Sequence, residues 1–317
     1  MSTIILRASS IGHIARKIID RCAEGCRPSI HSTFPNAINI TISDTLITIK
    51  SNRVRSEVDI VLDEEDILHL SGALNSYVSK RDEVSVRANV IVLGGNLVID
   101  LGSSSTYIPR FRLSSYCPEE IFNIDMNSTA ERFLKIMLIL DKLYDEDLTV
   151  LGYLLKEIHR ILEEKRLEGV RGFIEDRVAM VFKNLLGFGR GLTPSGDDIL
   201  IGFLSTYNNL APRCLGSQPI KVNGEELRRT TELSAHIIYN ASKGVMNEVI
   251  DNMLTLNIGD DPLYPLLDLA YLGHSSGVMM GIGVLLALAI CKAIWSGEEE
   301  LHDLVTRFSG ILQSKTI

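Results

Sequence analysis

The sequence predicts an α+β fold, in which an antiparallel β-rich N-terminal part is followed by a mainly helical C-terminal part. In the first 118 residues, apolar residues alternate with polar ones, which is the period of a strand with one buried face. From residue 119 onward, apolar residues recur every three or four positions, which is the period of an amphipathic helix. We therefore expect two domains, residues 1–118 and 119–317, and the second carries two unusual loops.

The N-terminal part consists of short alternating segments separated by turns. Gly94-Gly95-Asn96 is a strong hairpin turn. The acidic run 63–66 is expected to begin a short helix that ends near residue 78. The strands that we expect cover residues 38–42, 46–49, 58–62, 84–92, 97–99 and 107–113. No glycine loop leads from one of these strands into a helix, so a dinucleotide-binding fold is not indicated.

The C-terminal part is a series of helical segments. The helices that we expect cover residues 133–140, 154–164, 171–186, 199–207, 225–254, 266–272, 278–295 and 298–312. For the helix over 225–254, a break at Gly244 is left open as an alternative. The run from Gly277 to Cys291 is uncharged over 15 residues, fewer than the roughly 20 needed to span a bilayer. We interpret it as a buried core helix and expect no membrane partner.

Composition excludes several classes of protein. A hydrophobic fraction of 45% and a charged fraction of 23% are typical of a soluble globular protein. The net charge is −8 and no Lys/Arg cluster forms a stripe, so we expect no nucleic-acid partner. The N-terminal segment does not resemble a signal peptide, and the five scattered cysteines favour a reducing compartment over a zinc site. We therefore expect a cytoplasmic protein.

The densest run of unusual residues is the glycine loop, Gly187 to Gly196, and the start of the helix after it. Glycines 187, 189 and 191 alternate with other residues, so the backbone there can adopt positive φ. Ser195 is expected to be the N-cap of a helix whose first turn carries Asp197 and Asp198. Two interpretations remain open, a simple helix cap stabilised by acidic residues and a functional loop.

A second loop, Gly273 to Gly277, precedes the apolar helix near the C-terminus. Ser-Gly at 195–196 is followed by Gly202, and Ser-Gly at 276–277 is followed by Gly283 at the same spacing. We expect both helix starts to face one ligand, although Ser-Gly is also common where helices begin.

These loops are suited to a small anion such as a phosphate or carboxylate, because amides at a helix start bind anions. The substrate-binding residues that we predict are Arg190, Gly191, Thr193, Ser195, Gly196, Ser275, Ser276 and Gly277. Asp197 and Asp198 would act in catalysis, hold Mg²⁺ against the anion or orient a substrate amide, with only one of them facing the ligand. His274 is the candidate general acid or base, or alternatively a loop histidine that caps backbone groups. We expect no cofactor beyond this Mg²⁺.

The residues Gly-Arg-Gly-Leu-Thr-Pro-Ser-Gly-Asp-Asp at 189–198 and Gly-His-Ser-Ser-Gly at 273–277 resemble the two signatures of the AllH-like family. The resemblance covers about residues 187–288. It implies a subunit of oxamate carbamoyltransferase that acts with other subunits in anaerobic allantoin breakdown. The reaction implied is reversible carbamoyl transfer between oxalurate and phosphate, which gives oxamate and carbamoyl phosphate. Val278-Met279-Met280 stand where the resemblance leads one to expect an acidic residue.

Two functions of different classes follow. The chain is either a catalytic carbamoyltransferase subunit or a non-catalytic subunit that binds a small anion and assembles with partner proteins. Turnover by the isolated chain would distinguish the first from the second.

Overall fold

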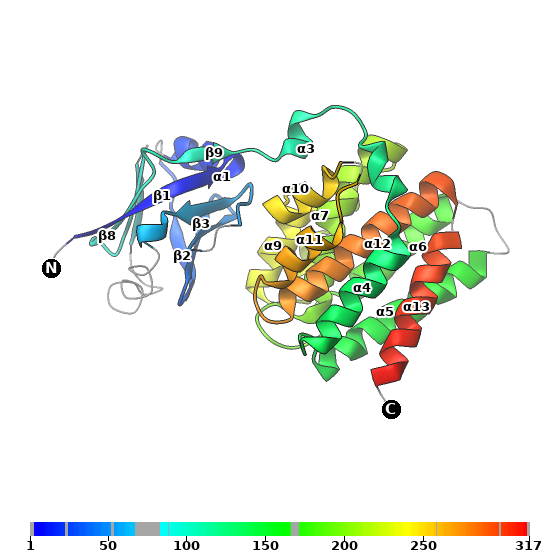
Figure 1. The fold of residues 1–317 in the computed structure, drawn as a ribbon. Coiled ribbons are helices and arrows are strands. Elements are labelled where there is room, and N and C mark those ends of the chain that lie inside the picture. The colour runs from blue at the N-terminus through cyan, green and yellow to red at the C-terminus, as the bar shows by residue number, and fades with distance from the viewer. Residues whose placement is uncertain are drawn as a thin grey trace. The chain divides into compact units, whose positions relative to one another are not determined.

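The computed structural model describes residues 3–22, 25–51, 54–66, 83–87, 89–165, 171–257, 259–297 and 299–315. The chain divides into two compact units. The first contains Met1–Leu113 together with Val245–Glu248, and the second contains Ser114–Gly244 together with Val249–Ile317. Figure 1 shows strands in the first unit and helices throughout the second, which confirms the α+β class.

The first unit is built on one sheet in the order β2-β3-β4-β5-β1-β8-β7-β6, with β9 pairing β1. Its strands are β1 (Ile4–Gly12), β2 (Ser29–Phe34), β3 (Ala37–Ile42), β4 (Thr45–Lys50), β5 (Asp59–Leu62), β6 (Val84–Arg87), β7 (Val90–Leu93), β8 (Leu97–Asp100) and β9 (Ser105–Tyr107). Helix α1 (His13–Cys22) buries Ala15 and Ile19 in the same core as the inward-facing isoleucines of β3 and β4.

The hairpin of β3 and β4 follows directly from its sequence. Ile38 faces Ile49 and Ile40 faces Ile47, and all four side chains are fully buried. The turn residues Ser43 and Asp44 both have positive φ, 48° and 64°, as the two-residue turns that match strand twist require. This hairpin is confirmed as predicted.

The expected antiparallel arrangement is wrong in part, because the sheet is mixed. β1 pairs in parallel with both β8 and β9, and β4 pairs in parallel with β5. The reason is that β1 runs into α1 instead of a hairpin, and strands separated by a long connection can pair in parallel. The alternation of apolar residues specifies a buried face but not strand direction.

One further expectation for this unit is wrong, and another falls partly outside the described residues. The strand expected over 107–113 ends at Tyr107, and Arg110–Leu113 form the short helix α3 directly after Pro109, where proline favours a helix start. Where the acidic run was expected to begin a helix, Glu64–Asp66 form the 3-10 turn η1. The rest of the expected helix, toward residue 78, lies outside the described residues.

A short segment from late in the chain completes the first unit. The fully buried Glu57 accepts a hydrogen bond from Met246 N at 2.9 Å and another from Arg112 Nε at 3.1 Å. Arg55 forms an ion pair with Glu248. The segment Val245–Glu248 is thus held by a buried carboxylate, which explains why it belongs to this unit.

The second unit consists of helices. They are η2 (Glu119–Asn123), α4 (Met126–Ile139), α5 (Asp145–Lys165), α6 (Arg171–Asn184), α7 (Ser195–Leu215), α8 (Gly224–Leu227), α9 (Glu232–Ser242), α10 (Glu248–Leu254), α11 (Leu263–Ala270), α12 (Ser276–Ser296) and α13 (Glu299–Lys315). The helix expected over 225–254 is in fact three. Thr231 caps the start of α9, which the sequence did not predict. The break considered at Gly244 is confirmed, because α9 ends before this glycine, whose φ is 78°.

The helix expected over 199–207 is also longer than its apolar run. α7 continues through Pro212 to Leu215 and ends at Gly216, which has a left-handed φ of 64°. Asn209 helps to extend it, because its side-chain amide donates to the carbonyl groups of Ser205 and Gly244. The amide nitrogen of the buried Asn209 is therefore paired by the fold, which the sequence period does not reveal.

The centre of the second unit is the pair α7 and α12, which lie against each other (Figure 1). Among the described helices, α12 alone has the length and apolar composition to cross a membrane, and 83% of its most apolar window is buried inside the protein. Its burial is that of the core helix predicted from the sequence.

Glycines let the two central helices approach closely. A Cβ atom added at Gly202 of α7 would overlap the carbonyl oxygen of Met280, and one added at Gly283 of α12 would overlap that of Ile199. The two contacts are reciprocal, because each glycine meets the residue three positions before the other. The repeated spacing seen in the sequence therefore corresponds to a symmetric helix contact.

The structure forms disulfides that the scattered cysteine spacing did not predict. Cys117 is bonded to Cys214, with Cα atoms 5.0 Å apart, and Cys22 is bonded to Cys26. Folding joins positions that are 97 residues apart in the first pair. Cys291 is buried and takes part in neither disulfide.

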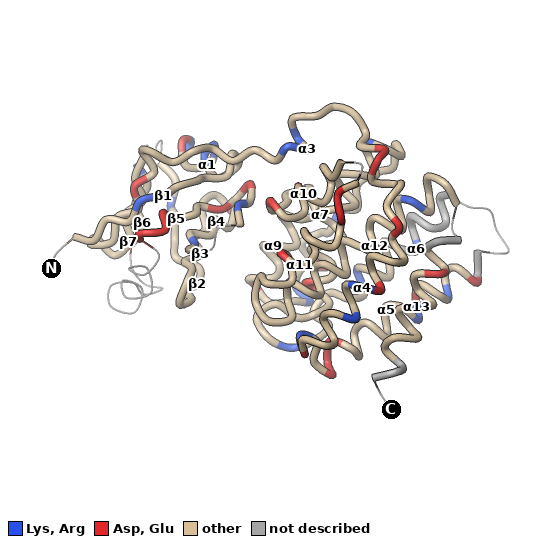
Figure 2. Tube along the Cα trace, in the orientation of Figure 1, with Lys and Arg blue, Asp and Glu red and all other residues tan. Residues whose placement is uncertain are grey.

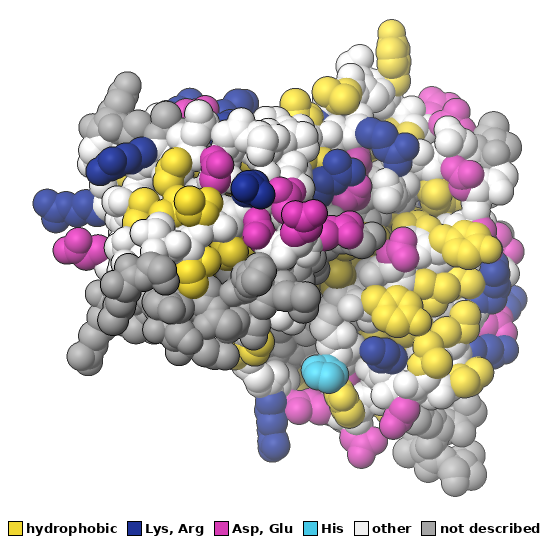
Figure 3. All heavy atoms as spheres, turned by 60° about the vertical axis from the view of Figure 1, so that its left-hand side comes forward, with side chains coloured by type: hydrophobic (Ala, Val, Ile, Leu, Met, Phe, Trp, Pro, Cys, Tyr) yellow, Lys and Arg dark blue, Asp and Glu magenta, His cyan; other side chains and the backbone are white. Residues whose placement is uncertain are grey.

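Charged residues of both signs are interspersed along the coloured trace of Figure 2. In the space-filling view, exposed apolar side chains gather over the helical unit (Figure 3). The exposed apolar residues of the helical unit include Ile139, Tyr264 and Tyr271, whose exposed fractions are 82%, 69% and 70%.

Candidate functional site

The glycine loop adopts a conformation that requires glycine. Gly187, Gly189 and Gly191 have φ values of 74°, 117° and 94°, a region that other residues rarely adopt. A Cβ atom at Gly187 would also overlap the carbonyl oxygen of Arg229. The alternating glycines therefore allow the loop to fold tightly against the segment that precedes α9.

Ser195 does not cap α7, contrary to the sequence-based expectation. The helix begins at Ser195 itself, and Pro194 is the N-cap residue without a side-chain bond. The Ser195 hydroxyl instead donates to Asp147 Oδ1 at 2.5 Å. Asp147, in the first turn of α5, is 2% exposed and also accepts from the Tyr144 amide at 2.9 Å. The serine is therefore committed to a buried carboxylate on another helix.

Replacing Ser195 tests this role. Ser195→Ala is expected to lower the free energy of unfolding by about 1–3 kcal/mol, because the buried Asp147 oxygen loses its donor. Urea denaturation measures the change. Ser296→Ala is the matched control, since the hydroxyl of Ser296 is exposed and donates only to a carbonyl of its own helix. Equal stability of the two variants would show that the Ser195 bond contributes nothing.

Asp197 holds the glycine loop in place. Its side chain is fully buried. Oδ1 accepts from the Gly187 amide at 2.7 Å, and Oδ2 accepts from the Thr230 hydroxyl. Burial raises the pKa of Asp197, while the hydrogen bonds from Gly187, Thr230 and Ser234 act in the opposite direction. Both carboxylate oxygens are thus engaged with the protein.

Asp198 lies where the two loops meet. It is 3% exposed, and hydrogen bonds connect its carboxyl group to Ser276 of the second loop and Thr193 of the first. The hydroxyl oxygens of Thr193 and Ser276 are 3.2 Å apart. Burial, with added repulsion from Asp197 and Asp147, raises the pKa of Asp198 to about 8. At neutral pH this carboxyl group is therefore mostly protonated and can donate a hydrogen bond or a proton.

The structure thus brings together Thr193, Ser195, Asp198 and Ser276, and it adds residues that the sequence did not single out. Asp147 belongs to an acidic run in the first turn of α5. Such a run is common at helix N-termini, so nothing in the sequence distinguishes Asp147 from its acidic neighbours. Thr230 lies inside a segment predicted as helix, whereas in the structure it comes just before the N-cap residue of α9. No local pattern distinguishes either residue, since each becomes part of the site only through folding.

Other predicted residues are placed differently. The Gly196 amide donates to the Phe188 carbonyl at 2.8 Å, so this proposed anion donor is already used. The Arg190 side chain is 92% exposed, with its Nε 4.0 Å from Glu146 Oε1. Gly191 is exposed in the loop, and so is His274. Among the described contacts of His274, none reaches the buried aspartates. In the second loop, Ser275 is the N-cap residue of α12, and Gly277 lies close to the carbonyl oxygen of Leu269.

The two adjacent aspartates point toward different partners. Asp197 points to Gly187 and Thr230, whereas Asp198 points to Thr193 and Ser276. Within the described chain, the groups of three convergent metal-binding side chains do not include either of them. The arrangement favours a protonated carboxyl group at Asp198 over a Mg²⁺ ligand.

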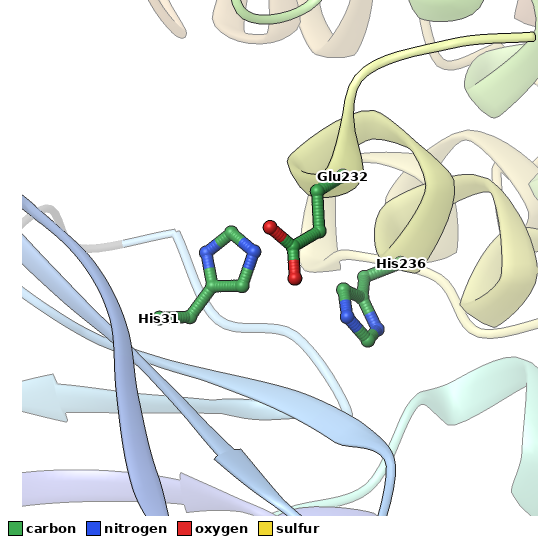
Figure 4. A group of neighbouring side chains, drawn as sticks. All are labelled: His31, Glu232 and His236. Carbon is green, nitrogen blue, oxygen red and sulfur yellow. The ribbon is translucent and has the colours of Figure 1, made fainter. Parts of the chain in front are cut away.

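Helix α9 presents a further acidic and basic pair. Glu232 and His236 are four residues apart and project from the same helix (Figure 4). His31, also labelled in Figure 4, belongs to β2 of the first unit, where its Nδ1 is 3.0 Å from Ser32 Oγ.

Two surface hollows of the second unit lie along α4, beside Asp125, Ser128 and Arg132, and not at the glycine loop.

Comparisons with known proteins match both halves of the chain. Residues 185–288 match a family model described as oxamate carbamoyltransferase subunit AllH. Residues 7–106 match a model described as the AllH family N-terminal domain. No curated protein and no solved structure matches the chain. The first match spans both loops, and the second spans most of the sheet.

Proposed function

Because the chain belongs to the AllH family of oxamate carbamoyltransferase subunits, we propose that the two loops bind the carbamoyl substrate and that Asp198 acts on it. The substrate class is a small anion: oxalurate, oxamate, phosphate or carbamoyl phosphate. The proposed place of the reaction is the anaerobic breakdown of allantoin. Other subunits of the same transferase are the expected partners.

One feature supports this proposal most, the buried carboxyl group of Asp198 between two loops of the matched region, where burial raises its pKa to about 8. A carbamoyl group has a carbonyl oxygen that accepts hydrogen bonds and an amide that donates them. Thr193 and Ser276 are only half-buried, and we expect their hydroxyl groups to contact a ligand that also bonds to the buried carboxyl group of Asp198. Hydroxyl groups can either donate or accept, which suits an amide and an anion equally well.

The reaction needs a proton at one defined atom. In the direction from oxalurate, a phosphate oxygen attacks the carbamoyl carbon and the bond from that carbon to the oxamate nitrogen breaks. The leaving nitrogen must then gain a proton to become oxamate. A carboxyl group with a pKa of about 8 carries that proton at neutral pH, and in the reverse direction its carboxylate takes the proton back.

A ligand panel tests the proposal. Thermal shift and calorimetry of the full chain with phosphate, carbamoyl phosphate, oxalurate and oxamate, each with and without Mg²⁺, should show binding of the carbamoyl compounds. Turnover is then measured for the chain alone and with its partner subunits. Binding without turnover in either setting would favour the non-catalytic alternative. Absence of binding by all four compounds, with partners present, would contradict the proposal.

A further inference from the structure

A cluster of metal-binding side chains lies on α5 and α13, away from the two loops. His159 and Glu163 are four residues apart on α5 and therefore share a face of the helix. His302 comes from the first turns of α13, which packs against α5. The nitrogen or oxygen ligand atoms of these three side chains all lie within 4.8 Å of one another.

The distances are close to those of a metal site. His302 Nε2 is 3.6 Å from Glu163 Oε1, and the two imidazole rings have centroids 5.6 Å apart. Ligand atoms at about 2.1 Å from a tetrahedral Zn²⁺ ion are about 3.4 Å from each other. Small side-chain rotations of the exposed His159 and Glu163 would bring the remaining separations into that range.

The environment of His302 gives a second reason. Its Nε2 is buried and has no hydrogen-bond partner among the described residues, which is unusual because buried polar atoms are normally paired. A metal ion bound to this nitrogen would satisfy it. The surrounding ligands, a second imidazole and a carboxylate, are those that Zn²⁺ and related ions prefer.

We infer that His159, Glu163 and His302 form a binding site for a divalent transition metal ion, for which Zn²⁺ is the best suited. Three protein ligands leave the fourth tetrahedral position for water. The ion would bridge α5 and the C-terminal helix α13. His159 lies 12 residues after Asp147 on α5, which corresponds to about 18 Å along the helix, so the ion is not part of the loop site.

Zinc titration of the metal-free full chain tests the inference. Isothermal calorimetry should show that the unaltered chain binds one Zn²⁺ ion tightly. The variants His302→Gln and Glu163→Gln should bind this ion more weakly. Each substitution removes a direct ligand, so the affinity should fall by at least about 100-fold, the upper end of the loss seen for outer partners of metal ligands. Co²⁺ in place of Zn²⁺ should give visible absorption bands of a low-coordinate site, and these bands should disappear in both variants.

Two matched controls separate this site from other histidines and acids. Glu157→Gln removes a carboxylate on α5 that pairs with Arg160 instead, and His274→Gln removes an exposed loop histidine. Both should bind Zn²⁺ as the unaltered chain does. The inference is overturned if the unaltered chain binds no Zn²⁺, or if His302→Gln and Glu163→Gln bind it as tightly as the controls.

Discussion

Asp198→Asn is expected to reduce carbamoyl transfer by the assembled enzyme at least about 100-fold, the usual range for loss of a general acid or base. Asparagine keeps the shape of the side chain and can still bond to Thr193 and Ser276, but it cannot transfer a proton. In the unaltered protein the rate in the direction from oxalurate should decline as pH rises through about 8, because the carboxyl group whose pKa lies there loses the proton that it donates in this direction. Steady-state kinetics across pH measures both effects.

The same substitution should change how stability depends on pH. The pKa of Asp198 is raised from 3.8 to about 8 on folding, so between these values the folded state binds a proton that the unfolded state has released. Its contribution to the free energy of unfolding therefore declines as pH rises across this window, by up to about 1.4 kcal/mol per pH unit. Asp198→Asn should remove this decline and be the more stable protein at pH 8.

Asp197→Asn is the matched control for that experiment. Asp197 is equally buried, but both its oxygens accept hydrogen bonds from Gly187 and Thr230. An amide nitrogen in place of one oxygen would face a donor, so this variant should lose stability by about 1–3 kcal/mol. If Asp198→Asn keeps full activity in the assembled enzyme, or if both variants lose only stability, Asp198 is structural and the proposed role is wrong.

The sequence predicted those parts of the fold that a local pattern specifies. The hairpin of β3 and β4 could be read from alternating isoleucines around a turn. The burial of α12 followed from an apolar run too short to suggest a bilayer span. The meeting of the two loops was expected from a repeated Ser-Gly spacing, and Thr193 and Ser276 do lie together.

The failures concern properties that only the folded chain defines. Ser195 has the sequence context of an N-cap, yet a carboxylate on α5 competes for its hydroxyl group. Strand direction around β1 depends on partners 49 or more residues away. The opposite environments of Asp197 and Asp198 could not be separated in the sequence, because adjacent positions differ only in which neighbours the fold brings to them.

Gly202→Ala and Gly283→Ala are each expected to lower the free energy of unfolding by about 3 kcal/mol or more. An added methyl group would overlap the backbone of the opposite central helix at Met280 or Ile199. Backbone atoms cannot rotate away as a flexible side chain can, so α7 and α12 must separate, and overpacking of this kind reaches the upper end of its usual cost. Urea denaturation of the full chain measures the loss.

Gly152→Ala provides a control of opposite sign. Gly152 also lies inside a helix, α5, but nothing is within 4 Å of an added Cβ atom there. Alanine favours a helix over glycine by up to about 1 kcal/mol, so this variant should be slightly more stable than the unaltered chain. The sign of the change in the free energy of unfolding distinguishes an effect of close helix contact from an effect of helix propensity. If Gly202→Ala and Gly283→Ala also stabilise the protein, the two helices do not depend on glycine for their close approach. If they destabilise it, the same separation should pull Ser276 away from Thr193 and Asp198, and ligand affinity should fall together with stability.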